Sequence, residues 1–200
     1  MSLFTKSDLR QRVVERKQRD ATFSTKSAQE ILQERRKSAP PGTKFDIFLS
    51  HSYLDAELVL GLSLAFQALN YQVYVDWVVD SHLDRSNVSK ETARLLRARM
   101  EDCKCLFFAS TENTTTSKWM PWETGYFDAK KGKVAIVPIR DYTGWGDTYE
   151  GQEYLGLYPY ISINQLQGST APVLFVNEDA DTYVRFDSWL EGAKPFKRQK

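Results

Sequence analysis

Short apolar runs alternate through the middle of the chain with longer segments in which apolar side chains recur every three or four residues. The runs are typical of buried strands, and the longer segments, such as the one with Leu58, Leu62 and Phe66, are typical of amphipathic helices. Regular alternation of this kind predicts an α/β fold with a central, mostly parallel sheet and helices on both faces. The predicted strands cover residues 45–50, 71–76, 104–110 and 133–139.

The first 43 residues differ in character from the rest. They contain ten Lys and Arg against five Asp and Glu, so they carry a charge of +5 while the remaining 157 residues carry −4. Two weakly amphipathic helices are predicted here, the second starting at Ser27, which forms a capping-box pattern with Glu30. Because neither helix buries much by itself, the segment is either an oligomerisation or regulatory arm or a helical lead-in packed on the domain. Residues 39–42, Ala-Pro-Pro-Gly, mark its end.

After residue 140 the pattern is less regular. Residues 141–151 predict a long surface loop. Residues 157–163 predict an edge strand, because Pro159 cannot donate to a strand ladder. A short strand at 173–176 and a last helix at 181–190 precede a basic tail.

Composition argues against several classes of function. The net charge of +1 gives no indication of a nucleic-acid or membrane partner. No apolar run is long enough for a membrane span or a signal peptide, which predicts a cytoplasmic protein. Cys103 and Cys105 are interpreted as reduced core thiols, because a metal site would need more Cys or His nearby. The absence of a glycine-rich phosphate loop argues against a Rossmann dehydrogenase and a P-loop enzyme, and no serine nucleophile elbow is present.

Candidate chemistry is expected beyond the carboxyl ends of the strands, where folds of this class bind ligands. Hydroxyls and aromatic rings with few carboxylates suit a ribose-containing ligand. Ser52 with Asp55 could instead cap a helix, and a lone His51 is more typical of a hydrogen-bonded structural group than of a catalytic base. The candidates are Ser50, His51, Ser52 and Tyr53 after the first strand, Asp76, Trp77 and Asp84 after the second, and Trp119 and Glu123 after the third.

The pair Trp119 and Glu123 is the most informative of these candidates. The two residues are four apart, so they share one face of a predicted helix that ends at Gly132. Desolvation beside a large ring would raise the pKa of the carboxyl group. The alternative is a half-buried tryptophan with a surface glutamate near a helix start, where negative charge is favoured.

Two segments resemble the TIR (Toll/interleukin-1 receptor) domain. Residues 45–52, FDIFLSHS, are similar to its opening strand and loop, and residues 117–123, SKWMPWE, resemble the S-x-W-x-x-x-E segment of TIR domains that cleave NAD+. The order of elements between them also fits, and the greatest likeness is to bacterial stand-alone TIR proteins, some of which act in anti-phage defence. The resemblance implies a flavodoxin-like TIR fold. It divides the chain into a basic helical arm at 1–43 and a TIR domain at 44–200, with a core at 44–165 and a strand and helix extension at 166–200.

The resemblance also implies residue roles by position. Glu123 matches the glutamate required for NAD+ cleavage, and Trp119 matches the aromatic residue on the nicotinamide side of the pocket. The loop at 77–87 takes the place of the family's BB loop, in which Asp84 would contact ribose. Pocket positions near the phosphates or ribose are implied for Ser50, Ser52 and Tyr53.

The implied reaction is cleavage of the nicotinamide–ribose bond of NAD+, which is a substrate, with no cofactor and no metal. Nicotinamide leaves as a neutral base, so Glu123 would need only to stabilise the oxocarbenium-like charge. The product would be ADP-ribose or a cyclic or base-exchanged form. Implied partners are a homo-oligomer formed through TIR–TIR contacts and a downstream effector that senses the nucleotide. The alternative is a non-catalytic TIR signalling or scaffold module, as in receptor adaptors, which commonly lack this glutamate.

Overall fold

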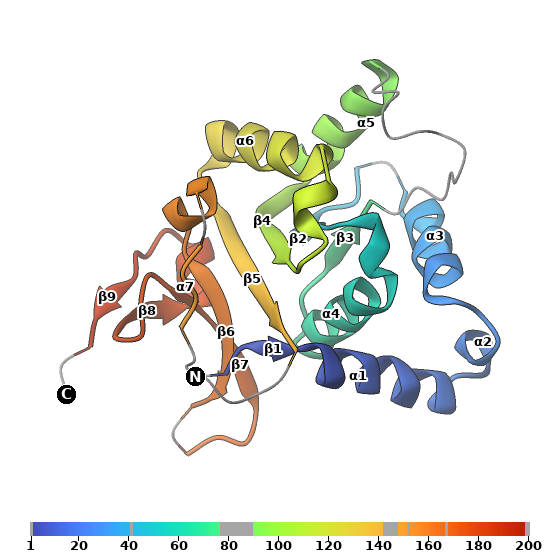
Figure 1. The fold of residues 1–200 in the computed structure, drawn as a ribbon, viewed down its shortest axis with the longest axis horizontal. Helices are drawn as coiled ribbons and strands as arrows, with labels where there is room; N and C mark the ends of the chain where they lie inside the picture. The colour runs from blue at the N-terminus through green and yellow to red at the C-terminus, as the bar shows by residue number, and fades with distance from the viewer. Residues whose placement is uncertain are drawn as a thin grey trace.

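A computed structural model describes residues 2–40, 42–76, 90–141, 148–151, 153–166 and 168–198. In these residues the chain forms a nine-stranded sheet in the order β3-β2-β4-β5-β6-β7-β8-β9, and the short β1 pairs with β5 (Figure 1). The predicted α/β class with a mostly parallel sheet is confirmed. The strands are β1 Phe4–Thr5, β2 Phe45–Ser50, β3 Val73–Val75, β4 Cys103–Ser110, β5 Val134–Arg140, β6 Tyr160–Gln165, β7 Pro172–Asn177, β8 Thr182–Arg185 and β9 Phe196–Lys197.

The strands from β3 to β6 run parallel in the order of a flavodoxin-like sheet. Counted from β2, this order is 2-1-3-4-5, and the direction of winding reverses between β2 and β4. In such sheets a ligand is expected beyond the carboxyl ends of the two strands at the reversal. Ser50 and Ser110 are the last residues of β2 and β4, so they mark this position.

The central strands bury side chains on both faces of the sheet. In β4, Cys105 and Phe107 pack in a cluster with α1, α3, α4 and α7, whereas Leu106 and Phe108 pack in a second cluster with α5 and α6. Figure 1 shows α5 and α6 on the side of the sheet away from α1 and α4. Burial on both faces explains why the strand sequences are continuous apolar runs. The helices are α1 Lys6–Arg19, α2 Ala21–Ser24, α3 Ala28–Ser38, α4 Ala56–Ala68, α5 Lys90–Glu101, α6 Trp119–Lys131 and α7 Phe186–Leu190, with 3-10 turns at Tyr53–Asp55, Thr114–Thr116 and Glu153–Leu157.

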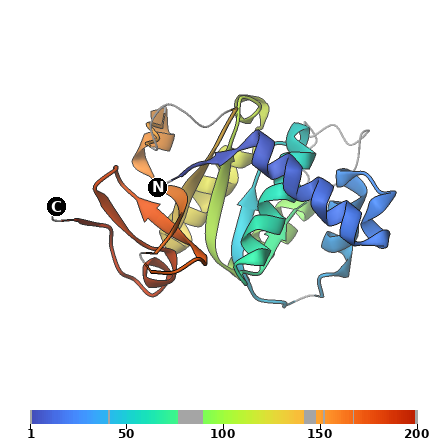
Figure 2. The same cartoon turned by 90° about the horizontal axis from the view of Figure 1, so that it is seen from below.

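The N-terminal segment packs against the domain and shares its core. Helix α1 lies alongside α4 in both views (Figure 1, Figure 2). The two helices approach closely: a Cβ atom at Gly61 would lie 2.5 Å from the carbonyl oxygen of Leu9, so only glycine fits there. The capping box predicted at Ser27 and Glu30 is present at the start of α3. An oligomerisation role for this segment and the domain boundary at residue 43 stay predictions.

Two expectations for the C-terminal part were wrong. The strand predicted at the edge of the sheet is β6, which lies inside it between β5 and β7, because Pro159 precedes the strand and its missing N–H costs no ladder bond. The helix predicted at 181–190 begins only at Phe186, and residues Thr182–Arg185 form β8 instead. Thr182, Tyr183 and Val184 are of types that favour strands, and β7 offers them an antiparallel partner.

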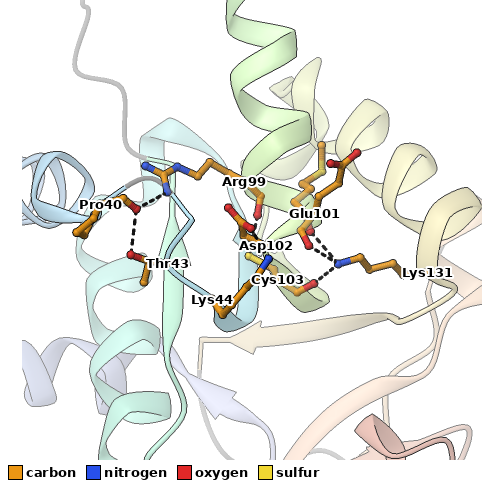
Figure 3. Close-up of polar contacts among 9 residues, drawn as sticks. Pro40, Thr43, Lys44, Arg99, Glu101, Asp102, Cys103 and Lys131 are labelled. Carbon is orange, nitrogen blue, oxygen red and sulfur yellow. Dashed lines mark hydrogen bonds and ion pairs between the residues drawn. The ribbon is translucent and has the colours of Figure 1, made fainter.

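At the amino end of β4, two basic side chains bind backbone carbonyl groups (Figure 3). Arg99 of α5 donates to the carbonyl oxygens of Ala39 and Pro40, both at 3.0 Å. Lys131 of α6 donates through Nζ to three carbonyl oxygens where α5 ends and β4 begins, those of Met100, Glu101 and Cys103, at 3.3, 2.8 and 2.5 Å. Together these contacts connect α5, α6 and the end of the N-terminal segment to the start of the sheet.

Both cysteines are buried free thiols, which confirms their interpretation as core residues. Burial raises the pKa of the Cys103 thiol to about 12, so the thiol stays protonated near neutral pH. Its Sγ donates to the carbonyl oxygen of Arg99 at 3.1 Å.

Candidate active site

Glu123 lies one turn into helix α6, at the carboxyl end of the parallel sheet. The predicted helix is present and ends at Gly132, whose φ of 59° is the left-handed conformation typical of a helix end. The Glu123 residue is 7% exposed, and its Oε2 accepts a hydrogen bond of 2.5 Å from Ser50 Oγ at the end of β2. A buried carboxylate is costly unless it is hydrogen-bonded. The contact with Ser50 therefore holds the carboxylate at the point where the winding of the sheet reverses.

An aromatic cluster occupies the same helix. Trp119 is half-buried at the start of α6, and its ring meets that of Trp122 edge to face, with 5.4 Å between centroids. Trp122 stacks on Tyr126 at 5.9 Å, and the guanidinium of Arg97 lies 5.3 and 5.7 Å from the centroids of these two rings. Of these aromatic residues, only Trp119 was predicted as a site residue from the sequence. The Trp119 ring thus packs against Trp122, which in turn contacts Arg97 of α5.

Two of the residues that follow Ser50 make hydrogen bonds with nearby backbone groups. Nδ1 of His51 lies 2.8 Å from the carbonyl oxygen of Leu49, and because a carbonyl only accepts, Nδ1 carries the proton. Ser52 was expected to cap the helix after it, but its Oγ accepts from the N–H of Leu54 at 3.4 Å and so caps the 3-10 turn that precedes α4. Tyr53 is half-buried against the first core cluster. Ligand contacts of these residues stay predictions.

Asp76, after β3, is bonded to the N-terminal segment. Its Oδ1 accepts from Arg36 Nε at 2.7 Å and from the hydroxyl of Tyr74 at 3.1 Å. Burial, followed by the neighbouring Asp76 charge, raises the pKa of Tyr74, so this hydroxyl stays a neutral donor. The structure therefore gives Asp76 an intramolecular partner, and its contact with a ligand stays a prediction. The other two predicted pocket residues, Trp77 and Asp84, lie outside the described residues.

A second buried carboxylate, Asp55, was missed as a site residue. It is 6% exposed, and its two oxygens accept from Thr111 Oγ1 at 2.6 Å and from Asn113 Nδ2 at 2.7 Å. The sequence pattern suited Asp55 to a helix cap, and Asp55 does precede α4, but its carboxylate makes no capping bond. One available signal was topological: Asp55 and Thr111 follow β2 and β4, which end at the same edge of the sheet.

Carboxylates, hydroxyls and aromatic rings thus gather at this edge, a set suited to binding sugar hydroxyls and stacking on a flat ring. Across the described ranges, no group of three or more His, Cys, Asp and Glu residues is arranged to hold a metal ion. In the same part of the chain, no helix combines the length and the apolar character needed to cross a membrane.

Sheet order, flanking helices and the glutamate-bearing helix after the third parallel strand define the flavodoxin-like TIR fold. No family model matches the chain. It is 48% identical over 192 residues to the "Probable 3' cyclic ADP-D-ribose synthase ThsB'" of Bacillus cereus (strain MSX-D12), an alignment that covers 96% of this chain and 99% of that protein. It is 37% identical over 83 residues, 41% of this chain and 22% of the other, to the "Putative cyclic ADP-D-ribose synthase TIR2" of Cytobacillus dafuensis. The chain belongs to the bacterial TIR-domain family that includes ThsB'.

Proposed function

We propose that this chain cleaves the nicotinamide–ribose bond of NAD+ and forms a cyclic ADP-ribose. The observation that carries the proposal is the buried carboxylate of Glu123, held by Ser50 where the winding of the sheet reverses. The name of the Bacillus cereus relative, a probable 3' cyclic ADP-D-ribose synthase similar over almost its whole length, supports the same class of reaction here.

The contact between Ser50 and Glu123 suits the carboxylate for binding ribose. Ser50 donates to one carboxylate oxygen and thereby fixes the orientation of the group. A carboxylate has about four lone-pair sites, so it can also accept hydrogen bonds from sugar hydroxyls. The fixed negative charge then lies where positive charge develops on the sugar, and this preorganisation lowers the barrier.

The bond changes need no general acid. The C–N bond breaks, and its electron pair leaves with the nicotinamide nitrogen, which turns from cationic to neutral. The ribose carbon becomes oxocarbenium-like, and Glu123 stabilises it. A hydroxyl oxygen of the same molecule then bonds to this carbon and releases its proton, which gives a cyclic product. Capture by water instead gives linear ADP-ribose.

Trp119 provides a surface against which the flat nicotinamide ring can pack, since aromatic faces stack on one another. Its contact with Trp122 fixes the angle of that surface. The family resemblance supports the wider setting: a cytoplasmic chain that assembles through TIR–TIR contacts, with a product that a separate effector senses in anti-phage defence.

The test incubates the purified chain with NAD+, follows nicotinamide release, and identifies the product by chromatography and mass spectrometry. A cyclic product is lighter than ADP-ribose by one water molecule. Glu123→Gln keeps the size of the side chain and removes its charge, so kcat is expected to fall roughly 10²–10³-fold. Equal release by this variant would remove Glu123 from the mechanism. If the wild-type chain releases no nicotinamide even at concentrations that favour self-assembly, the non-catalytic scaffold becomes the better account.

A further inference from the structure

The connection between β4 and α6, residues 111–118, leads the chain from the sheet to Glu123. Helix α6 begins directly after it, so its position determines where the Glu123 carboxylate lies relative to Ser50 on β2. Two charged residues from other parts of the chain bind this β4–α6 connection. They are Asp55, which follows β2, and Lys6 of the N-terminal segment.

Asp55 holds the β4–α6 connection from the inner side. Its carboxylate accepts from Thr111 and Asn113, and Thr111 Oγ1 in turn accepts from the N–H of Asn113 at 3.1 Å. Asp55 and Thr111 are both buried, so each would lose a partner that water cannot replace if the other were changed. Like the bond between Ser50 and Glu123, these bonds join the segment at the end of β2 to the segment that follows β4.

Lys6 holds the same connection from the outer side. It is the first residue of α1, and its Nζ lies 2.6 Å from Glu112 Oε1 and 2.7 Å from Asp141 Oδ1, which follows β5. The Lys6 side chain is only 12% exposed, whereas those of Glu112 and Asp141 are 63% and 72% exposed. The backbone fixes the starting point of Lys6, because Thr5 pairs with Arg140 in the sheet.

We propose that Asp55 and Lys6 are positioning residues: they hold the β4–α6 connection from two sides and thereby keep the Glu123 carboxylate at Ser50. The kinetic consequences rest on the proposed function. Ion pairs with exposed partners contribute little to global stability. If Lys6 acted on stability alone, its replacement would therefore leave kcat unchanged. A displacement of about 1 Å at a catalytic group, by contrast, can cost about 100-fold in rate. The N-terminal segment would thus form part of the frame of the active site.

The experiment uses the full-length chain with two variants, Asp55→Asn and Lys6→Met. Each has a matched control far from the site. Asp46→Asn changes an aspartate at the amino edge that binds the N–H of Gln72 at 2.8 Å, and Lys26→Met removes an ion pair of 2.6 Å with Glu34 inside the N-terminal segment. Thr111→Val, which keeps the side-chain shape and removes the hydroxyl that donates to Asp55 and accepts from the N–H of Asn113, replaces Asp55→Asn if that variant does not fold.

Two measurements are made on each protein. The first determines kcat, KM and the ratio of cyclic to linear product. Of these quantities, the product ratio does not depend on how much of the protein is folded. Asp55→Asn is expected to lower kcat about 10- to 100-fold and Lys6→Met by a smaller factor, about three- to tenfold, with KM changed less and more linear product. The second is amide hydrogen exchange at residues 119–125, which is expected to become faster in both variants and in neither control.

Unchanged kcat, product ratio and exchange in both variants would overturn the proposal, as would equal changes in the two controls. The hydrogen-exchange measurement needs no activity. If the wild-type chain releases no nicotinamide, the proposed function fails, whereas faster exchange at 119–125 in the variants still supports the positioning role and unchanged exchange overturns it.

Discussion

The buried carboxylates at the carboxyl edge of the parallel sheet make a different kind of contact from that of Arg99 and Lys131 at the amino edge. At the amino edge, Lys131 and Arg99 donate to backbone carbonyl groups, as Figure 3 shows. At the carboxyl edge, buried side chains bind other side chains: Ser50 binds Glu123, and Thr111 binds Asp55. A backbone carbonyl is present whatever the residue, so the contacts of Arg99 and Lys131 each depend on one specific side chain, whereas those of Glu123 with Ser50 and of Asp55 with Thr111 each depend on two.

This difference separates stability from function. A cation at a helix C-terminus stabilises the helix at little cost, because the carbonyl groups there lack partners within the helix. A buried carboxylate carries a desolvation cost, and an apolar pair of similar size is often at least as stabilising. We therefore interpret the amino edge as a structural junction and the carboxyl edge as the site that the rest of the fold supports.

The largest effect is expected at the carboxyl edge. Ser50→Ala removes the donor that orients Glu123, so kcat for nicotinamide release is expected to fall about 10- to 100-fold, since hydrogen bonds to charged groups contribute about 1.5–3 kcal/mol. The control is Ser63→Ala, another buried serine, which accepts from Arg35 at 3.2 Å in α4. Similar losses of kcat in both variants would show that burial, and not orientation of Glu123, accounts for the effect.

A smaller effect, on stability alone, is expected at the amino edge. Lys131→Met removes three bonds to carbonyl groups, so the free energy of unfolding is expected to fall by about 1–3 kcal/mol, while kcat per folded molecule stays unchanged. Urea unfolding and nicotinamide release measure the two quantities. The neighbouring exposed Lys130, changed to Met, is expected to shift the unfolding free energy by less than about 0.5 kcal/mol. A loss of kcat in Lys131→Met without loss of stability would break the distinction between the edges.

The smallest effect concerns pH and the ion pair at the rim of the site. The hydrogen bond from Lys6 is the main cause that holds the pKa of Glu112 below its ordinary value of 4.5. A carboxyl group with a lowered folded-state pKa stabilises the fold above its unfolded-state pKa, and this contribution is lost as the pH falls through the folded-state value. Glu112→Gln is therefore expected to lower the unfolding temperature slightly near neutral pH, and the difference from wild type should vanish well below pH 4.5. A difference that persists in acid would exclude this charge as its origin.

The strongest sequence patterns predicted structure that a few residues determine locally. The apolar run at 45–50 became β2 because most of its side chains are buried, and the helix with Trp119 ended at Gly132 because glycine readily adopts the left-handed conformation of a helix end. Strand β1 could not be predicted in this way, because two residues have no period and its pairing with β5 is a tertiary contact. For β8 the apolar spacing fitted a helix, but pairing with β7 decided the outcome.

The candidate site, like the fold, was predicted only in part. Topology alone placed Ser50 and Glu123 at one edge, and the structure joins them by a hydrogen bond. The partners of Asp55 and Asp76 could not be predicted, because both capping and ligand binding suit an aspartate after a strand, and only the packed structure selects Thr111 for the first and Arg36 for the second.

The most direct test of the central claim is a crystal structure of the Glu123→Gln chain with NAD+ bound. We expect hydroxyls of the nicotinamide ribose to lie within hydrogen-bonding distance of the side chain at position 123, with the nicotinamide ring against Trp119. A structure in which NAD+ binds with that ribose out of reach of position 123 would contradict the central claim.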